Sequence, residues 1–211
     1  MPAEDFYYTV ESPIRAPDFK VKGSRFIADL VPVSTKTEVD HALAEIRKEF
    51  HDASHHSFAY RLGPESLLLR AADDGEPAGT AGKPILLVLT SRKITNVLLV
   101  VTRFFGGTKL GTGGLARAYA EAAQQAVSMS KVVKVYLTKT VSLEVHYEDL
   151  PSMERLIHLF EAEIQETTYL SSVSLTVAVR EFKLEPFLAA IMDTFHGRVG
   201  LGSIEGIATP Q

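Results

Sequence analysis

The N-terminal part of the chain shows two hydrophobic patterns. Short segments rich in β-branched and aromatic residues predict strands, and an apolar residue at every third or fourth position predicts a helix. The predicted strands cover residues 6–15, 19–33, 58–62 and 67–71. A helix is predicted over residues 35–50, with Ser34 or Thr35 as its N-cap and Glu38 completing a capping box.

The most strongly patterned stretch lies in the middle of the chain. Residues 97–101 form an unbroken apolar run, which is typical of a strand buried on both faces. Five glycines follow between Gly106 and Gly114, and apolar side chains then recur at helical spacing at positions 115, 118, 119, 122 and 126. The pattern therefore predicts a buried strand that runs into a glycine-rich loop, which in turn opens a helix.

The C-terminal part has a simpler order of elements. Its predicted strands cover residues 138–146, 164–170, 173–180 and 199–207, and its predicted helices cover residues 150–162 and 184–195. This order, strand–helix–strand–strand–helix–strand, is that of the ferredoxin-like split βαβ fold. We therefore predict an α+β protein with two domains, residues 1–135 and residues 136–211.

The composition is that of a globular protein. Of the 211 residues, 45% are hydrophobic and 23% are charged, and there is no cysteine. Disulfides, a thiol nucleophile and cysteine-based zinc sites are therefore excluded. No apolar run reaches the roughly 18 residues of a membrane helix, and the N-terminus is acidic, unlike that of a signal peptide. We expect a cytoplasmic protein with no membrane partner.

Charge is distributed unevenly along the chain. Residues 1–135 carry 17 basic and 15 acidic side chains, whereas residues 136–211 carry 5 and 11. Residues 77–120 contain no Asp or Glu. The basic residues of this acid-free window are Lys83, Arg92, Lys93, Arg103, Lys109 and Arg117. An acidic second domain disfavours wrapping of the whole protein around nucleic acid and leaves one local basic surface as the candidate contact.

The glycine-rich loop and its cations predict an anion-binding site. The first N–H groups of a helix lack partners and carry the positive end of its dipole, and glycines let the backbone approach an oxyanion closely. The loop fits neither the Walker nor the dinucleotide-binding pattern, so no cofactor is predicted. The alternative to an anion site is that the glycines serve only a tight turn and close packing of the helix on the strand. The predicted binding residues are Lys22, Arg25, His55, Arg103, Gly106, Gly107, Lys109, Gly111, Gly113, Gly114 and Arg117.

Three carboxylates directly precede the acid-free window. Asp73, Asp74 and Glu76 could bind a divalent cation or act as an acid/base pair. Alternatively they form turns, with Thr80 capping a helix that carries residues 85–89. The turn interpretation is favoured because no calcium-loop spacing follows. The histidines at 51, 55 and 56 lack a fixed third ligand nearby, so a metal site there is not expected.

Four motifs give the chain a family resemblance. They are Lys-Gly-Ser-Arg-Phe at 22–26, the segment 55–61 ending Ala-Tyr-Arg, the segment 73–84 from Asp-Asp-Gly-Glu-Pro to Gly-Lys-Pro, and Thr-Arg-Phe-Phe-Gly-Gly-Thr-Lys-Leu-Gly-Thr-Gly-Gly-Leu within 96–119. Over residues 19–127 the chain resembles the IMPACT/YigZ family. The acidic remainder resembles the small C-terminal domain of the bacterial two-domain members. Ser57 stands where many members carry cysteine.

The resemblance implies a fold and an area of function but no catalytic residue. It implies an N-terminal ribosomal-protein-like α/β sandwich, similar to the fourth domain of elongation factor G, and a C-terminal domain similar to that factor's fifth. Both of those domains work on the ribosome. Eukaryotic members of the family regulate translation through protein–protein contacts.

Three functions are consistent with these observations. The favoured one is a non-catalytic RNA- or ribosome-associated protein in translation regulation, whose loop contacts backbone phosphate. The second is a protein-interaction regulator of translation, in which the same surface binds an acidic protein partner. The third is a metal-dependent phosphate-handling enzyme, with the three carboxylates holding the metal opposite the basic loop. An enzyme is the less expected outcome.

Overall fold

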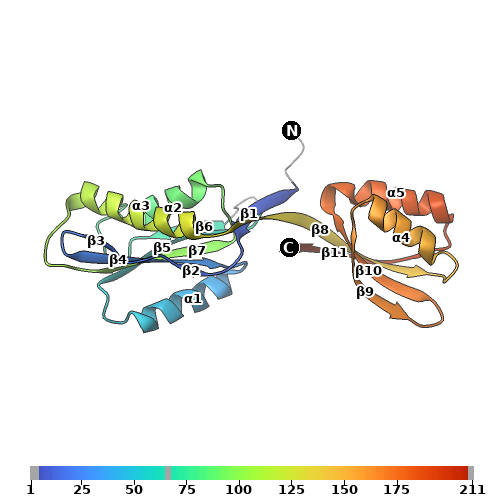
Figure 1. Ribbon diagram of the computed structural model, residues 1–211, viewed down its shortest axis with the longest axis horizontal. Coiled ribbons are helices and arrows are strands. Elements are labelled where there is room, and N and C mark those ends of the chain that lie inside the picture. The colour runs from blue at the N-terminus through green and yellow to red at the C-terminus, as the bar shows by residue number, and fades with distance from the viewer. Residues whose placement is uncertain (1–4, 65–67, 209–211) are drawn as a thin grey trace. The chain divides into compact units, whose positions relative to one another are not determined.

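The computed structural model describes residues 5–64 and 68–208, which form two compact units (Figure 1). The N-terminal unit comprises residues 7–134, and the C-terminal unit comprises residues 135–208 together with residues 5 and 6. The chain passes between the units within two strands, β1 (Phe6–Val10) and β8 (Val132–Val145). The predicted two-domain α+β fold is confirmed.

The N-terminal unit is built on a six-stranded sheet in the order β2-β4-β7-β5-β6, with β3 paired to β4. All of the pairings among these strands are antiparallel. The strands are β2 (Ile14–Arg15), β3 (Phe19–Val21), β4 (Ser24–Pro32), β5 (His55–Leu62), β6 (Leu68–Ala72) and β7 (Val97–Phe104).

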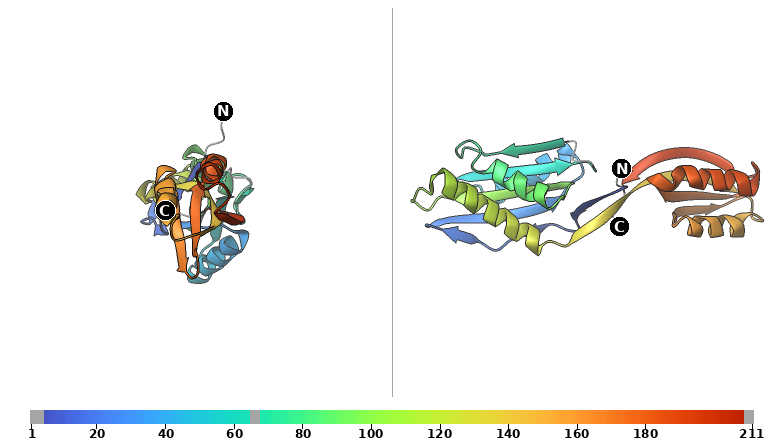
Figure 2. Two further views of the ribbon diagram at one scale, coloured as in Figure 1. Left: turned by 90° about the vertical axis from the view of Figure 1, so that its right-hand side faces the viewer. Right: turned by 90° about the horizontal axis from the view of Figure 1, so that it is seen from above.

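Helices cover both faces of this sheet because the central strand is apolar on both. In β7, Val97, Leu99 and Val101 pack against α2 (Gly82–Ser91) and α3 (Gly111–Met129). Leu98 and Val100 point the other way, into the core under α1 (Lys36–Glu49). Figure 1 shows α1 on one side of the sheet and the other two helices opposite, and Figure 2 shows α2 and α3 side by side.

Local sequence signals explain where α1 begins. The Thr35 hydroxyl accepts a hydrogen bond from the Glu38 backbone N–H at 3.2 Å, and the Glu38 carboxylate accepts one from the Ser34 backbone N–H at 2.8 Å. These bonds satisfy N–H groups that would otherwise lack partners at the helix start. Thr35 is therefore the N-cap, and the predicted pairing with Glu38 is present.

The C-terminal unit contains a sheet in which β8 lies between β11 (Gly200–Ala208) and β10 (Val173–Arg180), with β9 (Glu163–Tyr169) beyond β10. These neighbours are antiparallel. Placing β10 between β8 and β9 gives the predicted split βαβ order. The helices α4 (Leu150–Leu159) and α5 (Leu184–Phe195) bury Met153, Phe187 and Phe195 against one face of the sheet. A short 3₁₀ helix, Glu181–Lys183, precedes α5.

The strand predicted over residues 19–33 is broken into the two strands of a hairpin. Lys22 and Gly23 form a two-residue turn with φ of +46° and +81° between the paired residues Val21 and Ser24. A turn with positive φ at both central residues matches the twist of the flanking strands. The alternating pattern did not indicate it, because lysine is an uncommon residue at such a position. The strand predicted over residues 6–15 is likewise divided, into β1 and β2.

This hairpin turn packs against the glycine-rich loop. A Cβ atom on Gly106 would lie 1.9 Å from the carbonyl carbon of Gly23 and 2.3 Å from the backbone nitrogen of Ser24. The Gly106 N–H donates to the Ser24 hydroxyl at 3.2 Å. Gly106 therefore permits a backbone-on-backbone contact that holds the turn beside the loop.

We expect Gly106→Ala to destabilise the N-terminal unit by about 1–3 kcal/mol, because the added methyl group must displace backbone atoms rather than a flexible side chain. Chemical denaturation measures the effect. Gly113→Ala is the matched control, since a Cβ there would approach only Arg117 Nη1, at 3.7 Å. A Gly106→Ala protein that unfolds at the same denaturant concentration as the parent would contradict the close contact.

Candidate functional site at the N-terminus of α3

The glycine-rich loop joins β7 to α3, and its glycines have different roles. Gly107 and Gly111 adopt φ of +81° and +72°, which only glycine adopts readily. Gly113 and Gly114 lie in the first turn of α3, and a Cβ on Gly114 would lie 3.2 Å from Leu110 Cβ. Gly113 has neither a positive φ nor a close neighbour. The fold therefore gives no steric reason for glycine at position 113.

The first turn of α3 presents backbone donors without a capping side chain. Its N-cap residue is Leu110, no side chain caps the helix, and the first turn contains no acidic residue. The positive end of this 19-residue helix is thus left without a compensating charge from its own residues. At α1, by contrast, Thr35 and Glu38 fill this role. An anion would stabilise this end of α3.

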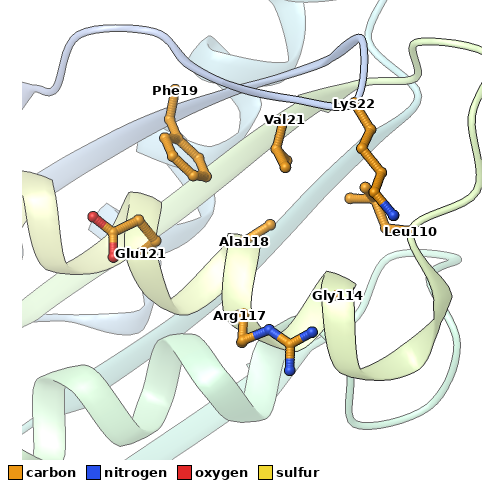
Figure 3. Close-up of a pocket in the computed structure, with 8 residues that line it drawn as sticks. All are labelled: Phe19, Val21, Lys22, Leu110, Gly114, Arg117, Ala118 and Glu121. Atoms are coloured by element: carbon orange, nitrogen blue, oxygen red, sulfur yellow. The ribbon is translucent and has the colours of Figure 1, made fainter.

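Three exposed cations surround this helix end. Lys22, Lys109 and Arg117 form no ion pair or hydrogen bond with any part of the chain that the structure describes. Lys22 and Arg117 line a cavity of about 380 Å³ between the β3–β4 hairpin and α3, here called the hairpin cavity (Figure 3). Its lining consists of Phe19, Val21, Lys22, Leu110, Gly114, Arg117, Ala118 and Glu121. In Figure 3 Lys22 reaches toward Leu110, and Arg117 extends past Gly114 on the other side of the helix.

Lys109 lines a second cavity, of about 320 Å³, here called the loop cavity. Its lining consists of Glu76, Pro77, Arg103, Phe105, Lys109, Leu110, Gly111, Thr112 and Leu115. Leu110 lines both cavities, so they adjoin at the start of α3. The fold thus brings the hairpin, the loop and the helix start together, as the anion-site prediction requires.

Arg103 has a different position from the one expected for a phosphate-binding residue. It is 4% exposed, and its guanidinium donates to Glu76 Oε1 at 2.6 Å and to the Ser24 hydroxyl at 3.2 Å. The same group lies over the rings of Phe26 and Phe105. Because Glu76 compensates its charge, Arg103 supports the loop and adds no net positive charge to the surface.

Arg25 and His55 are also engaged within the N-terminal unit. The Arg25 guanidinium lies 4.1 Å from the centroid of the Phe104 ring and 3.3 Å from an Asp18 carboxylate oxygen. His55 Nδ1 lies 2.8 Å from the backbone oxygen of Asp74, and its Nε2 lies 3.8 Å from Glu76 Oε1. Both side chains are half-buried, so they border the surface instead of projecting from it.

The three carboxylates of the 73–76 segment make separate contacts. Asp73 accepts hydrogen bonds from the N–H groups of Gly79, Ala81 and Gly82 at 2.8–3.0 Å. Asp74 accepts from Arg47 at 2.9 Å and from the His56 backbone N–H at 2.7 Å. Among the described residues, no three His, Asp or Glu side chains are grouped so as to hold a metal ion. These contacts support the turn interpretation.

Asp73, rather than Thr80, binds the N-terminus of α2. Thr80 donates its hydroxyl to the Pro77 carbonyl at 2.6 Å and makes no cap. Burial acts to raise the pKa of Asp73, but the three backbone N–H donors outweigh it and hold the pKa below its ordinary value. Sequence reasoning missed this role because the carboxylate reaches forward by six to nine residues.

Two further polar residues of the site were not predicted. The Tyr119 hydroxyl donates to Glu76 Oε1 at 2.8 Å, and burial together with this bond raises the pKa of Tyr119. The buried Ser57 hydroxyl donates to the Asp73 carbonyl at 2.7 Å. Helical periodicity marked Tyr119 only as a core residue. Its hydroxyl needs a buried acceptor, and that requirement was the available signal.

We expect Asp73→Asn to lower the free energy of unfolding at neutral pH, because the variant loses the charged acceptor of three backbone N–H groups. The loss should be only roughly 1 kcal/mol, since solvent partly screens this half-buried carboxylate. A depressed pKa means that the stabilisation is complete above the ordinary pKa of about 3.9 and is lost as the pH falls through the lower folded-state value. Urea unfolding across this range should therefore show the two proteins converging in acid. Asp52→Asn, at an exposed position, is the control, and a constant difference at every pH would contradict the assignment.

Comparison with known proteins identifies both units. The Impact N-terminal domain matches residues 22–127, and a domain of unknown function, DUF1949, matches residues 143–198. The IMPACT family member YigZ of Escherichia coli is 34% identical over 188 residues, which cover 88% of this chain and 92% of YigZ. Protein IMPACT of the rabbit, Oryctolagus cuniculus, is 36% identical over 93 residues, 42% of this chain and 29% of its own length.

A solved structure shares the fold over nearly the whole chain. It is a crystal structure described as that of a hypothetical protein, with a TM-score of 0.68 and 32% sequence identity over 95% of this chain and 98% of that one. The family model of the N-terminal unit and the length of the match to YigZ both confirm the resemblance seen in the motifs. The chain belongs to the IMPACT family.

Proposed function

We propose that this protein is a non-catalytic, RNA- or ribosome-associated factor in translation regulation, and that the start of α3 contacts phosphate backbone. Its membership of a family that includes eukaryotic Protein IMPACT supports a role in regulating translation. The observation that carries the proposal is an uncapped helix start, free of acidic residues, among Lys22, Lys109 and Arg117. Backbone N–H groups and ammonium groups are the donors that commonly bind nucleic-acid phosphates.

The geometry of Lys22 supports a functional role for its charge. Its φ of +46° places a side chain with a Cβ in the left-handed region, where asparagine or glycine would be less strained. Strain of this kind on the surface is a reason to look for function. In the proposed complex, Lys22 extends the phosphate contact from the helix start to the hairpin.

The location we propose is the cytoplasm, where ribosomes and their RNA are found. No helix in residues 5–64 and 68–208 is both long and apolar enough to cross a membrane. The C-terminal part of the sequence is acidic, so phosphate contact is assigned to the N-terminal unit alone.

A groove favours a second candidate function, a regulator that binds an acidic protein partner. A cavity of about 440 Å³ between α2 and α3 is lined by Pro84, Leu87, Val88, Ser91, Ala116, Arg117, Ala120 and Gln124. Leu87 is 58% exposed and lies there with Arg117. An apolar side chain beside a cation suits a peptide with neighbouring apolar and acidic residues. Leu87→Ser would weaken that contact and leave phosphate binding intact.

We expect Lys109→Glu and Arg117→Glu each to weaken binding of the protein to ribosomes or RNA by roughly tenfold or more, with little dependence on RNA sequence. Each should also reduce the slope of log affinity against log salt by about 0.7–1, since each removes one phosphate contact. Co-sedimentation over a salt series measures both quantities.

The matched control is Lys48→Glu, which makes the same charge reversal on α1, the helix on the opposite face of the sheet. This variant should bind like the parent protein. Affinity and salt slope that are unchanged in both the Lys109→Glu and Arg117→Glu proteins would overturn the proposed function.

Two milder substitutions should separate binding from folding. Gly113→Ala should raise stability by about 0.5–1 kcal/mol, because alanine favours the helix more than glycine does, yet weaken binding by placing a methyl group beside the first-turn N–H groups. Lys22→Asn should preserve the positive-φ turn and remove its charge. Denaturation and RNA co-sedimentation of the same samples measure the two properties. Full binding by both variants would rule out contact with the turn and with the helix amides.

A further inference from the structure

The loop cavity has a mixed apolar and charged lining. Most of its side chains are apolar, namely Pro77, Phe105, Leu110 and Leu115. The charged side chains of Glu76 and Arg103 line the rest of the wall. Lys109 and the first residues of α3 line it as well. Its volume of about 320 Å³ lies near the lower end of the roughly 300–1,000 Å³ of small-molecule sites. The cavity therefore suits one ring system with an attached anion.

One carboxylate oxygen of this lining is free to bind a ligand. Arg103 is 4% exposed, and its Nε is shut off from solvent, so this side chain contributes its packed guanidinium to the wall and no donor to the cavity. Glu76 Oε1 accepts hydrogen bonds from Arg103 and Tyr119, whereas its Oε2 accepts none from any described residue and is not among the unpaired atoms that are shut off from solvent. A carboxylate oxygen with free lone pairs at the cavity wall accepts a hydrogen bond from a ligand amino group.

An exposed aromatic ring completes the pocket. Phe105 is 49% exposed, and the Arg103 guanidinium lies 5.4 Å from its ring centroid. Phe104, the neighbouring aromatic, packs edge-on against Phe50 and beneath Arg25 instead. Single-stranded RNA is commonly bound by an aromatic side chain that stacks on an unpaired base beside a cation that meets the phosphate.

We propose that the loop cavity binds the base of one unpaired nucleotide that carries an exocyclic amino group. The base stacks on Phe105, and its amino group donates to Glu76 Oε2. The attached phosphate lies against Lys109 and the first-turn N–H groups of α3. This inference rests on the proposed function and deepens it by naming the ligand as single-stranded and amino-bearing.

The chemistry selects against uracil and against duplexes. Adenine, cytosine and guanine each carry an amino group, whereas uracil would place a carbonyl oxygen against the Glu76 carboxylate, so that two acceptors would face each other. A base that is paired in a helix cannot enter the cavity without leaving the stack. Binding should therefore favour oligo(A) and oligo(C) over oligo(U) and over double-stranded RNA.

Fluorescence anisotropy with labelled oligoribonucleotides of equal length tests this inference on the full chain. Oligo(A) and oligo(C) should bind about fivefold or more tightly than oligo(U) at the same salt concentration. Phe105→Ala should weaken oligo(A) binding by roughly fivefold to a hundredfold, and Phe105→Tyr should retain it. Phe182→Ala, which removes a ring 56% exposed in the C-terminal unit, is the control and should have no effect.

Glu76→Gln should abolish the preference for amino-bearing bases. If the Glu76→Gln protein does not fold, the Phe105 variants, which change an exposed side chain, test the base pocket instead. Equal binding of all homopolymers, with no effect of Phe105→Ala, would overturn the base pocket. If binding still weakened steeply with salt in that case, the proposed phosphate contact would stand without the base pocket. Duplex binding as tight as oligo(A) binding would also overturn the pocket. An absence of binding to every oligonucleotide and to ribosomes at low salt would overturn the proposed function itself.

Discussion

The ion pair between Arg103 and Glu76 is the interaction on which the arrangement of the site depends. Both side chains are almost fully buried, with 5% and 3% of their surfaces exposed, and they meet at 2.6 Å. The pair joins the end of β7 to the turn after β6, and Tyr119 adds α3 by binding the same carboxylate oxygen. Removing one partner would leave a buried charge uncompensated, at a cost of about 3–5 kcal/mol. The pair therefore fixes both ends of the glycine-rich loop.

Much of the fold follows from local patterns that the sequence displays directly. The apolar run of β7, the capping residues of α1 and the strand and helix order of the C-terminal unit depend on neighbours within a few positions, which is why periodicity predicts them. The hairpin of β3 and β4 was missed because its turn contains Lys22 at a positive φ, and residue preference alone would not place a lysine there. A pattern can therefore identify a strand and miss the point at which it reverses.

The site was predicted less completely, because charge along a chain differs from charge in space. The acid-free window directed attention to Lys109 and Arg117, which are unpaired among the described residues. It also included Arg103, whose partner Glu76 lies 27 positions earlier and one residue outside the window. Asp73 similarly reaches backbone donors that no local motif specifies. Contacts of this range follow from the sheet and cannot be read from spacing.

The two-residue turn that packs against Gly106 affects how this surface would bind a ligand. The two-residue turn and the backbone-on-backbone contact at Gly106 hold the hairpin in one position beside the loop. The conformational entropy that a flexible loop would lose on association has already been lost when the chain folds. In the proposed complex, a surface that is formed before binding would select ligands by the spacing of their charges.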